Sequence, residues 1–208
     1  MALEKAFFRQ VMGRFTTGIT IVTTRDNELL AGLTVNAFCS VSLNPPLVLV
    51  CVANNSSTLP LLRASKIFAV NMLTTDQEEY SRIFANNIPE RFSFFENNTY
   101  YTATTGAPII DNALAFIDAR IVEEYPGGDH TIFIGQVEAM GTEGRISIVT
   151  REGREQNEQD NTDEAITATK ANPLLYYQGQ YRHLSALYRE PSIIESVKEN
   201  VEEPAGGR

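Results

Sequence analysis

The chain has 208 residues, 43% of them hydrophobic, which is enough to bury a substantial core in a single domain. Its formal net charge of -9 argues against a nucleic-acid partner or an anionic membrane surface, because both attract clustered Lys and Arg. With only two cysteines, Cys39 and Cys51, the chain cannot be a disulfide-dense scaffold, and we expect both to be buried within apolar strands. The cysteines and the two histidines show none of the usual zinc-ligand spacings, so no metal site is expected.

Apolar residues from Leu3 to Phe15 recur at helical spacing and predict an opening amphipathic helix that ends between Gly13 and Gly18. Charged residues interrupt the apolar pattern, so the segment lacks the core of a signal peptide. No other stretch approaches the length of a membrane span. We therefore expect a soluble cytoplasmic protein.

Short strands are expected to dominate the part of the chain that follows. Residues 19–24 and 29–34 flank the polar turn 25–28, which is a hairpin signal. Residues 47–52 and 67–73 are β-branched runs that suit buried strands. These patterns are typical of a barrel.

A capping box predicts a helix from about residue 76 to 85, with Thr75 as the N-cap and Glu78 at the third helical position. Further strands are expected at 113–123 and 131–139. The elements do not make a repeating strand–helix–strand pattern, so a doubly wound parallel sheet fits poorly. Periodicity alone predicts an antiparallel barrel or sandwich.

The segment from residue 34 to 58 combines polar side chains, a rigid Asn44-Pro45-Pro46 corner, an apolar strand and a hydroxyl cluster. Amides and hydroxyls can match the edge of a flat heteroaromatic ring, and Ser57 and Thr58 can meet a phosphate at a helix N-terminus. Taken singly, each feature also fits an ordinary strand surface, strand terminator or helix cap. Their combination favours a nucleotide-like cofactor such as a flavin.

A series of further motifs follows in order along the chain: Ser65 to Leu73, Gln77, Phe84-Ala85, Glu90-Arg91-Phe92, Thr105 to Pro108, Gly128-Asp129-His130 and Ile134 to Val137. Together with the segment 34–58, they resemble the short-chain flavin reductase family over about residues 7–140, and a weaker likeness returns at 173–177. The resemblance implies a mainly β fold with flanking helices, a split β-barrel. It also implies a homodimer with the flavin near the subunit interface.

The same resemblance implies which residues contact the flavin. The ring would be lined by Thr34, Val35, Asn36, Ala37 and Ser40, and along its adjoining edge by Cys51, Val52, Ala53 and Asn54. The phosphate would be met by Ser57 and Thr58, and Arg91 would add a charge-assisted contact. Tyr176, Tyr177 and Tyr181 could cover a ring face or the dimer interface, although aromatic residues at such spacing more often pack in a core.

The Gly128-Asp129-His130 segment is implied to lie at the nicotinamide side of the flavin, with Gly128 and Asp129 among the cofactor contacts. Glycine lets a backbone approach a ligand closely. The His130 imidazole can donate to or accept from a nicotinamide carboxamide or a flavin carbonyl, which makes it the candidate catalytic residue. The alternative is an ordinary turn before a strand, with a solvated imidazole.

The resemblance implies an NAD(P)H-dependent flavin reductase, which transfers a hydride from NADH or NADPH to FMN or FAD and can supply a separate monooxygenase. Two alternatives remain open: a flavin-dependent oxygenase on the same fold, and a non-catalytic flavin-binding electron-transfer protein. The residues do not choose between FMN and FAD or between NADH and NADPH. They also do not decide whether the flavin is tightly bound or diffusible.

One domain is expected from residue 1 to 190. Residues 151–170 are polar enough to be an exposed loop insertion, which the compact family pattern lacks. A partner-binding or lid role for this acidic insertion is an alternative to a tolerated surface loop. Residues 191–208 are expected to form a flexible tail.

Overall fold

The computed structural model describes residues 4–86, 88, 91, 93–142, 145–149, 155–158 and 172–184. In chain order the elements are α1 (Lys5–Met12), β1 (Thr17–Gly18), β2 (Thr20–Asp26), β3 (Leu29–Val35), β4 (Phe38–Leu43), β5 (Pro46–Ala53), α2 (Leu59–Ser65), β6 (Ile67–Met72), η1 (Thr75–Gln77), α3 (Glu78–Ala85), α5 (Phe94–Asn97), β7 (Tyr100–Thr102), β8 (Pro108–Ile110), β9 (Ala115–Gly127), β10 (His130–Thr142), β11 (Arg145–Val149), β12 (Glu155–Glu158), β13 (Leu175–Tyr177) and β14 (Gln180–Arg182). The expected mainly β fold with flanking helices is confirmed.

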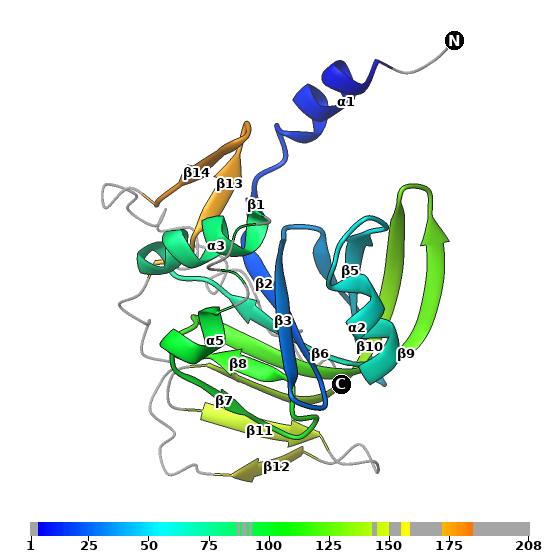
Figure 1. Ribbon diagram of the computed structural model, residues 1–208, viewed down its shortest axis with the longest axis vertical. Helices are drawn as coiled ribbons and strands as arrows, with labels where there is room; N and C mark the ends of the chain where they lie inside the picture. Colours follow the sequence, from blue (N-terminus) through cyan, green and yellow to red (C-terminus); the bar gives the residue numbers. More distant parts are fainter. Residues whose placement is uncertain are drawn as a thin grey trace, which may run out of the picture.

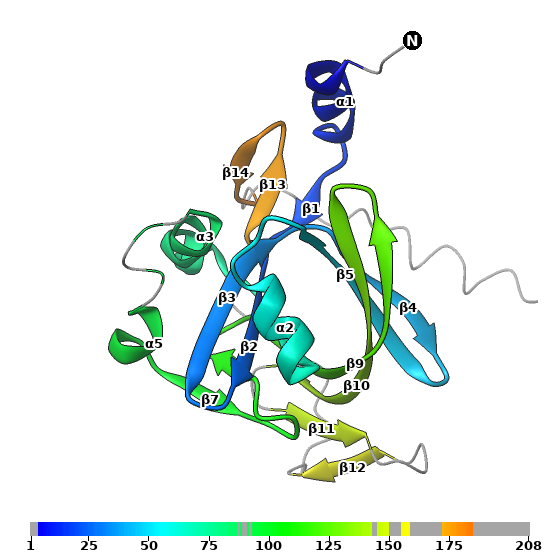
Figure 2. The same ribbon diagram turned by 45° about the vertical axis from the view of Figure 1, so that its right-hand side comes forward.

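The largest sheet has the strand order β12-β11-β10-β9-β6-β2-β3, and β5 joins it by pairing with both β10 and β4. Two strands pair with the same edge of β10. Strand β5 pairs with it from His130 to Gln136, and β11 pairs with it from Ala139 to Thr142. Strand β9 follows the other edge of β10 almost from end to end. Because β3 and β5 contact each other, the sheet curls into a split barrel (Figures 1 and 2).

The barrel encloses a core of β-branched and aromatic side chains. Val22, Val50, Phe68 and Phe133 come from four different strands, and all are fully buried. Helix α2 closes one side of this core with Leu59 and Leu62. A second cluster lies beneath α3 and α5, where the Phe84 and Phe94 rings meet with their centroids 4.7 Å apart. Helices α2, α3 and α5 thus pack against the barrel, as Figure 2 shows.

The strands expected from the sequence are confirmed as β2, β3, β5, β6, β9 and β10. The β2–β3 hairpin turns at Asn27, whose φ of 54° is a conformation that asparagine tolerates better than most residues. The opening helix is confirmed as α1, but none of its residues is buried, and it stands away from the barrel (Figure 1). None of the helices in the described part of the chain is long and apolar enough to cross a membrane.

The predicted capping box is displaced by one residue. Thr74 rather than Thr75 is the cap, Gln77 rather than Glu78 closes the box, and a short 3-10 helix precedes α3. The Gln77 side chain decides this register, because it accepts from the Thr74 N–H at 3.2 Å and donates to the Asp111 carbonyl at 2.9 Å.

The expectation that both cysteines are buried is wrong, since Cys39 is exposed and Cys51 is half-buried. Burial alternates along β5, where Val50 and Val52 point into the core and Cys51 points to the opposite face.

Part of the expected loop at 151–170 is a strand, because Glu155–Glu158 pairs with β11 as β12. The remainder of that segment and the expected tail at 191–208 lie outside the described residues.

Asp118 on β9 is a fully buried carboxyl. Its Oδ2 accepts from the Thr105 N–H at 2.7 Å, and its Oδ1 accepts from the Thr105 hydroxyl. Burial raises the pKa of Asp118 above its ordinary value, in spite of the Thr105 hydrogen bonds, which lower it. The folded protein therefore holds this proton more tightly than the unfolded chain does, so the contribution of Asp118 to stability falls as pH rises through its folded pKa.

We expect Asp118→Asn to flatten the dependence of unfolding free energy on pH in this range, because an amide does not titrate. The amide can still accept from the Thr105 N–H and donate to the Thr105 hydroxyl, so the buried contacts are kept. Urea unfolding at a series of pH values from about 4 to 7 measures the difference between variant and wild type. Asp76→Asn, at an exposed carboxylate, is the control. Parallel profiles for wild type and Asp118→Asn would contradict the prediction.

Candidate functional site

Three segments that are distant in the sequence meet at one end of the barrel: residues 34–37, 51–54 and 128–130. The Cys51 N–H donates to the Ala37 carbonyl at 3.0 Å, and the Asn54 N–H donates to the Asp129 carbonyl at 3.0 Å. These main-chain hydrogen bonds tie the end of β3 and the tip of the β9–β10 hairpin to the end of β5. The structure thus brings together the segments that the sequence predicted to surround the flavin ring and the nicotinamide.

The side chains of these segments are not equally available to a ligand. Asn36, Ala37 and Ser40 are exposed. Val35 and Val52 belong to the core, with exposed fractions of 5% and 0%, so only their backbone atoms could reach a ligand.

Thr34 is also partly committed to the fold, because its hydroxyl donates to the Ser81 carbonyl of α3 at 2.7 Å. The Thr34 hydroxyl can therefore only accept a hydrogen bond from a ligand. Of the predicted ring contacts between residues 34 and 40, some can therefore offer a side chain to the ligand, and others can offer only backbone groups.

A cavity of about 920 Å³ lies between α1, the β4–β5 strands and the β13 strand. Its lining includes three of the predicted ring contacts, Asn36, Ala37 and Cys51. The sequence did not predict that Phe8 and Met12 of α1 also line it. Small-ligand sites have volumes of about 300–1,000 Å³ and mostly apolar walls with a few polar groups. The residues present therefore fit a flat ring such as that of a flavin.

The predicted phosphate cluster is organised around the Gly32 carbonyl of β3. The Thr58 hydroxyl donates to this carbonyl at 3.1 Å and accepts from Arg91 Nη2 at 2.7 Å. Arg91 Nε donates to the same carbonyl at 3.1 Å. Since Thr58 is 1% exposed and its one hydroxyl proton is used, it holds Arg91 in place and cannot offer that proton to a phosphate.

Ser57 is exposed beside this cluster, and Arg91 is half-buried. Burial lowers the pKa of Arg91, which remains a cation at neutral pH. Arg91 Nη1 donates to no acceptor within the described ranges, so the guanidinium retains donors for an anion. Ser57 and Arg91 are thus the better placed of the predicted phosphate contacts.

His130 is the first residue of β10 and lies opposite Gly127 on β9 and Ala53 on β5. Its Nδ1 is 2.8 Å from Asp129 Oδ1, and this hydrogen bond holds the pKa of the Asp129 carboxyl below its ordinary value. The side chain of His130 is 44% exposed, so the imidazole is oriented by Asp129 and still open to a ligand. Gly128 has a φ of 74°, a conformation that favours glycine at this turn.

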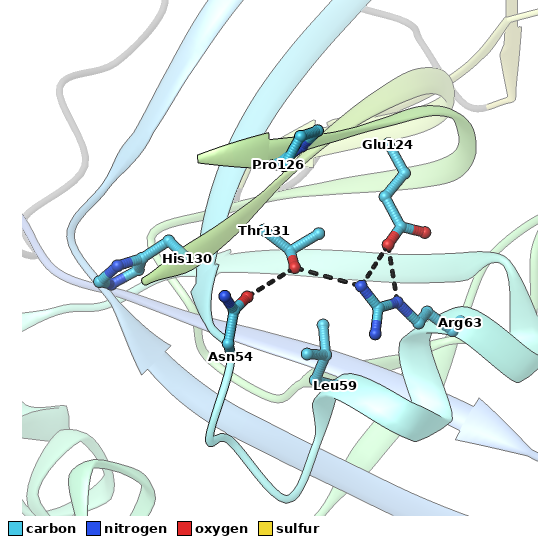
Figure 3. A pocket seen from close by; sticks show the side chains of 7 residues that line it. All are labelled: Asn54, Leu59, Arg63, Glu124, Pro126, His130 and Thr131. Carbon is cyan, nitrogen blue, oxygen red and sulfur yellow. Dashed lines mark hydrogen bonds and ion pairs between the residues drawn. The ribbon is translucent and has the colours of Figure 1, made fainter. Parts of the chain in front are cut away.

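His130 borders a second cavity, of about 530 Å³, whose lining residues differ from those of the first (Figure 3). Its lining consists of Asn54, Leu59, Arg63, Glu124, Pro126, His130 and Thr131. Arg63 Nε donates to Glu124 Oε1 at 2.6 Å, and Figure 3 shows the imidazole of His130 turned away from this ion pair. No local pattern in the sequence indicates this pair, because α2 and β9 are far apart in the chain.

Comparison with known proteins gives consistent matches over most of the chain. Residues 12–185 match the family model described as "Flavin reductase like domain". HsaB of Mycobacterium tuberculosis, the reductase subunit of a flavin-dependent monooxygenase, is 33% identical over 86% of this chain and 82% of its own length.

Two solved structures are also similar. Flavin reductase PheA2 superimposes with a TM-score of 0.70 at 34% identity, covering 88% of this chain and 99% of that one. The NADH:FAD oxidoreductase SgcE6 of Streptomyces globisporus, solved with NAD and FAD fragments, gives a TM-score of 0.71 at 30% identity, covering 89% and 96% of the two chains.

Proposed function

Because the chain belongs to the flavin reductase-like family, we propose that it transfers a hydride from NADH to a flavin, either FMN or FAD. The family and the split-barrel fold expected from the sequence are confirmed. The observation that supports the proposal is the junction of residues 34–37, 51–54 and 128–130, because the segments predicted to line the flavin and to face the nicotinamide meet there.

The bound cofactors supply the reactive chemistry, since hydride passes from a reduced nicotinamide to a flavin. The protein holds the two rings in position and limits the access of water. Asn36, Ala37 and the end of β5 would hold the flavin ring. Ser57 and Arg91 would hold its phosphate, and Gly128, Asp129 and His130 would face the nicotinamide.

The direct test mixes the purified protein with NADH or NADPH and with FMN or FAD under anaerobic conditions. We expect the visible absorbance of the flavin to bleach with NADH. Absence of bleaching with all four pairings would contradict the proposal. Tight retention of flavin without oxidation of the nicotinamide would instead favour the electron-transfer alternative.

We further propose that the reduced flavin is passed to a separate monooxygenase, as the name of the relative HsaB suggests for that protein. A diffusible product must dissociate. Anaerobic gel filtration after reduction should therefore elute the flavin separately from the protein, and co-elution would contradict this role.

The apolar face of α1 supports the expected homodimer. Phe7, Phe8, Val11 and Met12 are each more than half exposed in the single chain. A contiguous apolar surface of this kind is unusual on a monomer, so we propose that a second copy covers it. Sedimentation should show a dimer, and a monomer at all concentrations would contradict the proposal.

The expected cytoplasmic location stays a prediction.

His130→Ala should weaken the nicotinamide step more than flavin binding, because it removes an orienting hydrogen bond and leaves the ring and phosphate contacts in place. The expected loss is about 1–3 kcal/mol in NADH affinity or in the rate of flavin reduction. Single-turnover kinetics and titration with each cofactor measure the two effects.

His183→Ala is the matched control, since His183 is similarly exposed and also bonded to a carboxylate, Glu78. If His130→Ala reduces flavin at the wild-type rate and with the wild-type NADH affinity, the nicotinamide does not bind beside His130.

A further inference from the structure

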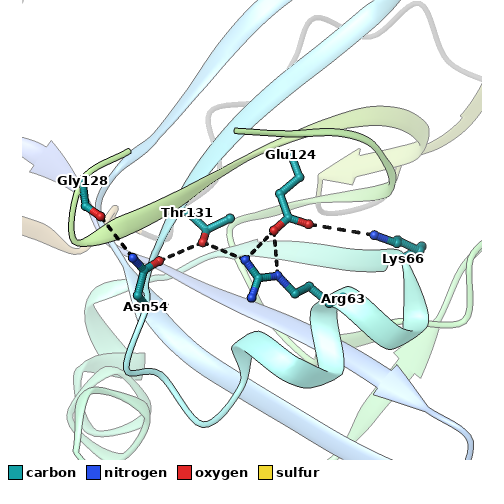
Figure 4. Close-up of polar contacts among 6 residues, drawn as sticks. All are labelled: Asn54, Arg63, Lys66, Glu124, Gly128 and Thr131. Atoms are coloured by element: carbon teal, nitrogen blue, oxygen red, sulfur yellow. Dashed lines mark hydrogen bonds and ion pairs between the residues drawn. The ribbon is translucent and has the colours of Figure 1, made fainter. Parts of the chain in front are cut away.

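A continuous chain of polar contacts links α2 to the turn that carries His130 (Figure 4). Glu124 on β9 binds Arg63 of α2, with Nη2 2.5 Å from Oε1. Arg63 Nη2 then donates to the Thr131 hydroxyl at 3.3 Å, and this hydroxyl donates to Asn54 Oδ1 at 2.8 Å. Asn54 Nδ2 completes the chain by donating to the Gly128 carbonyl at 3.1 Å.

The direction of these hydrogen bonds is fixed at both ends of the chain of contacts, by Arg63 and by the Gly128 carbonyl. A guanidinium can only donate, so the Thr131 oxygen must accept from it. The one proton of that hydroxyl is then directed at Asn54 Oδ1. The Gly128 carbonyl can only accept, so it requires the same orientation of the Asn54 side chain, with the amide nitrogen toward Gly128.

Asn54 holds the hairpin turn at two points. Its side chain donates to the Gly128 carbonyl, and its backbone N–H donates to the Asp129 carbonyl at 3.0 Å. These are the two residues immediately before His130. If the Asn54 amide rotated by half a turn, its oxygen would face the Gly128 carbonyl and one of the two hydrogen bonds would be replaced by a repulsion.

We propose that Arg63 and Thr131 are positioning residues that, through Asn54, fix the turn from Gly128 to His130 at the nicotinamide side of the site. The proposal rests on the function proposed above for that turn. Arg63 does not need to touch either cofactor for this role. Glu124 keeps the Arg63 guanidinium in place. Lys66 Nζ lies 3.9 Å from the second carboxylate oxygen of Glu124.

The energetics separate this role from a general contribution to stability. The side chain of Arg63 is 49% exposed, and an ion pair of that exposure contributes only about 0–1 kcal/mol to folding. Thr131, in contrast, is 3% exposed, so without Arg63 its hydroxyl still donates to Asn54 Oδ1 but must find a new donor among the buried groups around it. The effect of losing Arg63 should therefore appear locally, at the turn, and only weakly in the unfolding transition.

The test compares Arg63→Ala, Thr131→Val and Thr131→Ser with the wild type. Valine keeps the shape of threonine and loses the hydroxyl, whereas serine keeps the hydroxyl. Arg120→Ala is the matched control, because Arg120 pairs with Glu138 at 2.8 Å and has an exposed fraction of 50%, close to that of Arg63. The Arg120 pair lies on β9 and β10, and within the described part of the chain its hydrogen bonds do not reach Asn54.

The first readout is hydrogen exchange of the backbone N–H of Asn54, which donates to the Asp129 carbonyl and so reports on the turn without any cofactor. We expect exchange to accelerate about tenfold in Arg63→Ala and Thr131→Val, and to stay near wild type in Thr131→Ser and Arg120→Ala. The second readout is steady-state kinetics: the KM for NADH should rise about tenfold in the same two variants, while the Kd for flavin changes less than about twofold.

Unchanged Asn54 exchange in both Arg63→Ala and Thr131→Val would overturn the proposal, even if their activity fell. Equal rises in the flavin Kd and the NADH KM would also overturn it, because a general loosening of the site would explain them. Failure of the wild type to oxidise NADH would instead refute the proposed function, and the exchange result would still decide whether Arg63 holds the turn.

Discussion

Arg91→Ala is expected to weaken FMN binding by about 2–3 kcal/mol, a factor of about 30 to 150 in Kd. The guanidinium is held by Gly32 and Thr58, so its position is set before a ligand arrives. A preorganised cation loses little side-chain entropy when it binds a phosphate, and hydrogen bonds to charged groups are stronger than neutral ones.

Riboflavin provides the sharpest comparison, because it has the ring of FMN without the phosphate. We expect Arg91→Ala to weaken FMN binding and to leave riboflavin binding nearly unchanged, as measured by quenching of flavin fluorescence. Arg82→Ala, at an exposed arginine paired with Glu78, is the control. An equal loss for both ligands would show that Arg91 supports the fold of the site and that the phosphate binds elsewhere.

Gly135→Ala is expected to destabilise the barrel by about 3 kcal/mol, the upper end of the usual cost of overpacking. Gly135 lies in β10 between β5 and β9, and an added Cβ would come within 2.7 Å of Phe68 Cε1. Phe68 is fully buried in the centre of the core, so its ring has no free space to move into.

Urea unfolding measures this loss, with Gly18→Ala as the control because a Cβ at Gly18 would meet nothing within 4 Å. The double variant Gly135→Ala, Phe68→Leu should recover part of the stability that the two single variants lose when added together. Strictly additive effects would show that the two side chains do not compete for the same space.

Much of the fold could be predicted because its signals are local. Alternating β-branched residues and the polar turn at Asn27 indicate a hairpin in any context. The register of the α3 cap could not be predicted, because Thr74 and Thr75 are both good caps. The choice depends on Gln77 reaching the Asp111 carbonyl, 34 residues away.

The site was predictable as a set of segments and less so as a set of side chains. Motif order placed residues 34–37, 51–54 and 128–130 together, and the structure confirms their proximity. The hydroxyls of Thr34 and Thr58 were expected to face a ligand, yet each donates to a backbone carbonyl of the fold. Arg63 and Glu124 are 61 residues apart, so no local pattern indicated their pairing.

The double pairing of β10 limits how the length of this protein can change. From His130 to Gln136 the strand is hydrogen-bonded to β5 on one edge, and it pairs with β9 on the other. A single inserted residue there would turn the following side chains to the wrong face of the barrel. The turn at Leu43, which is 94% exposed, could grow at only the small entropic cost of a longer loop. Natural or engineered insertions should therefore accumulate at that turn and be rare within the strand that begins at His130.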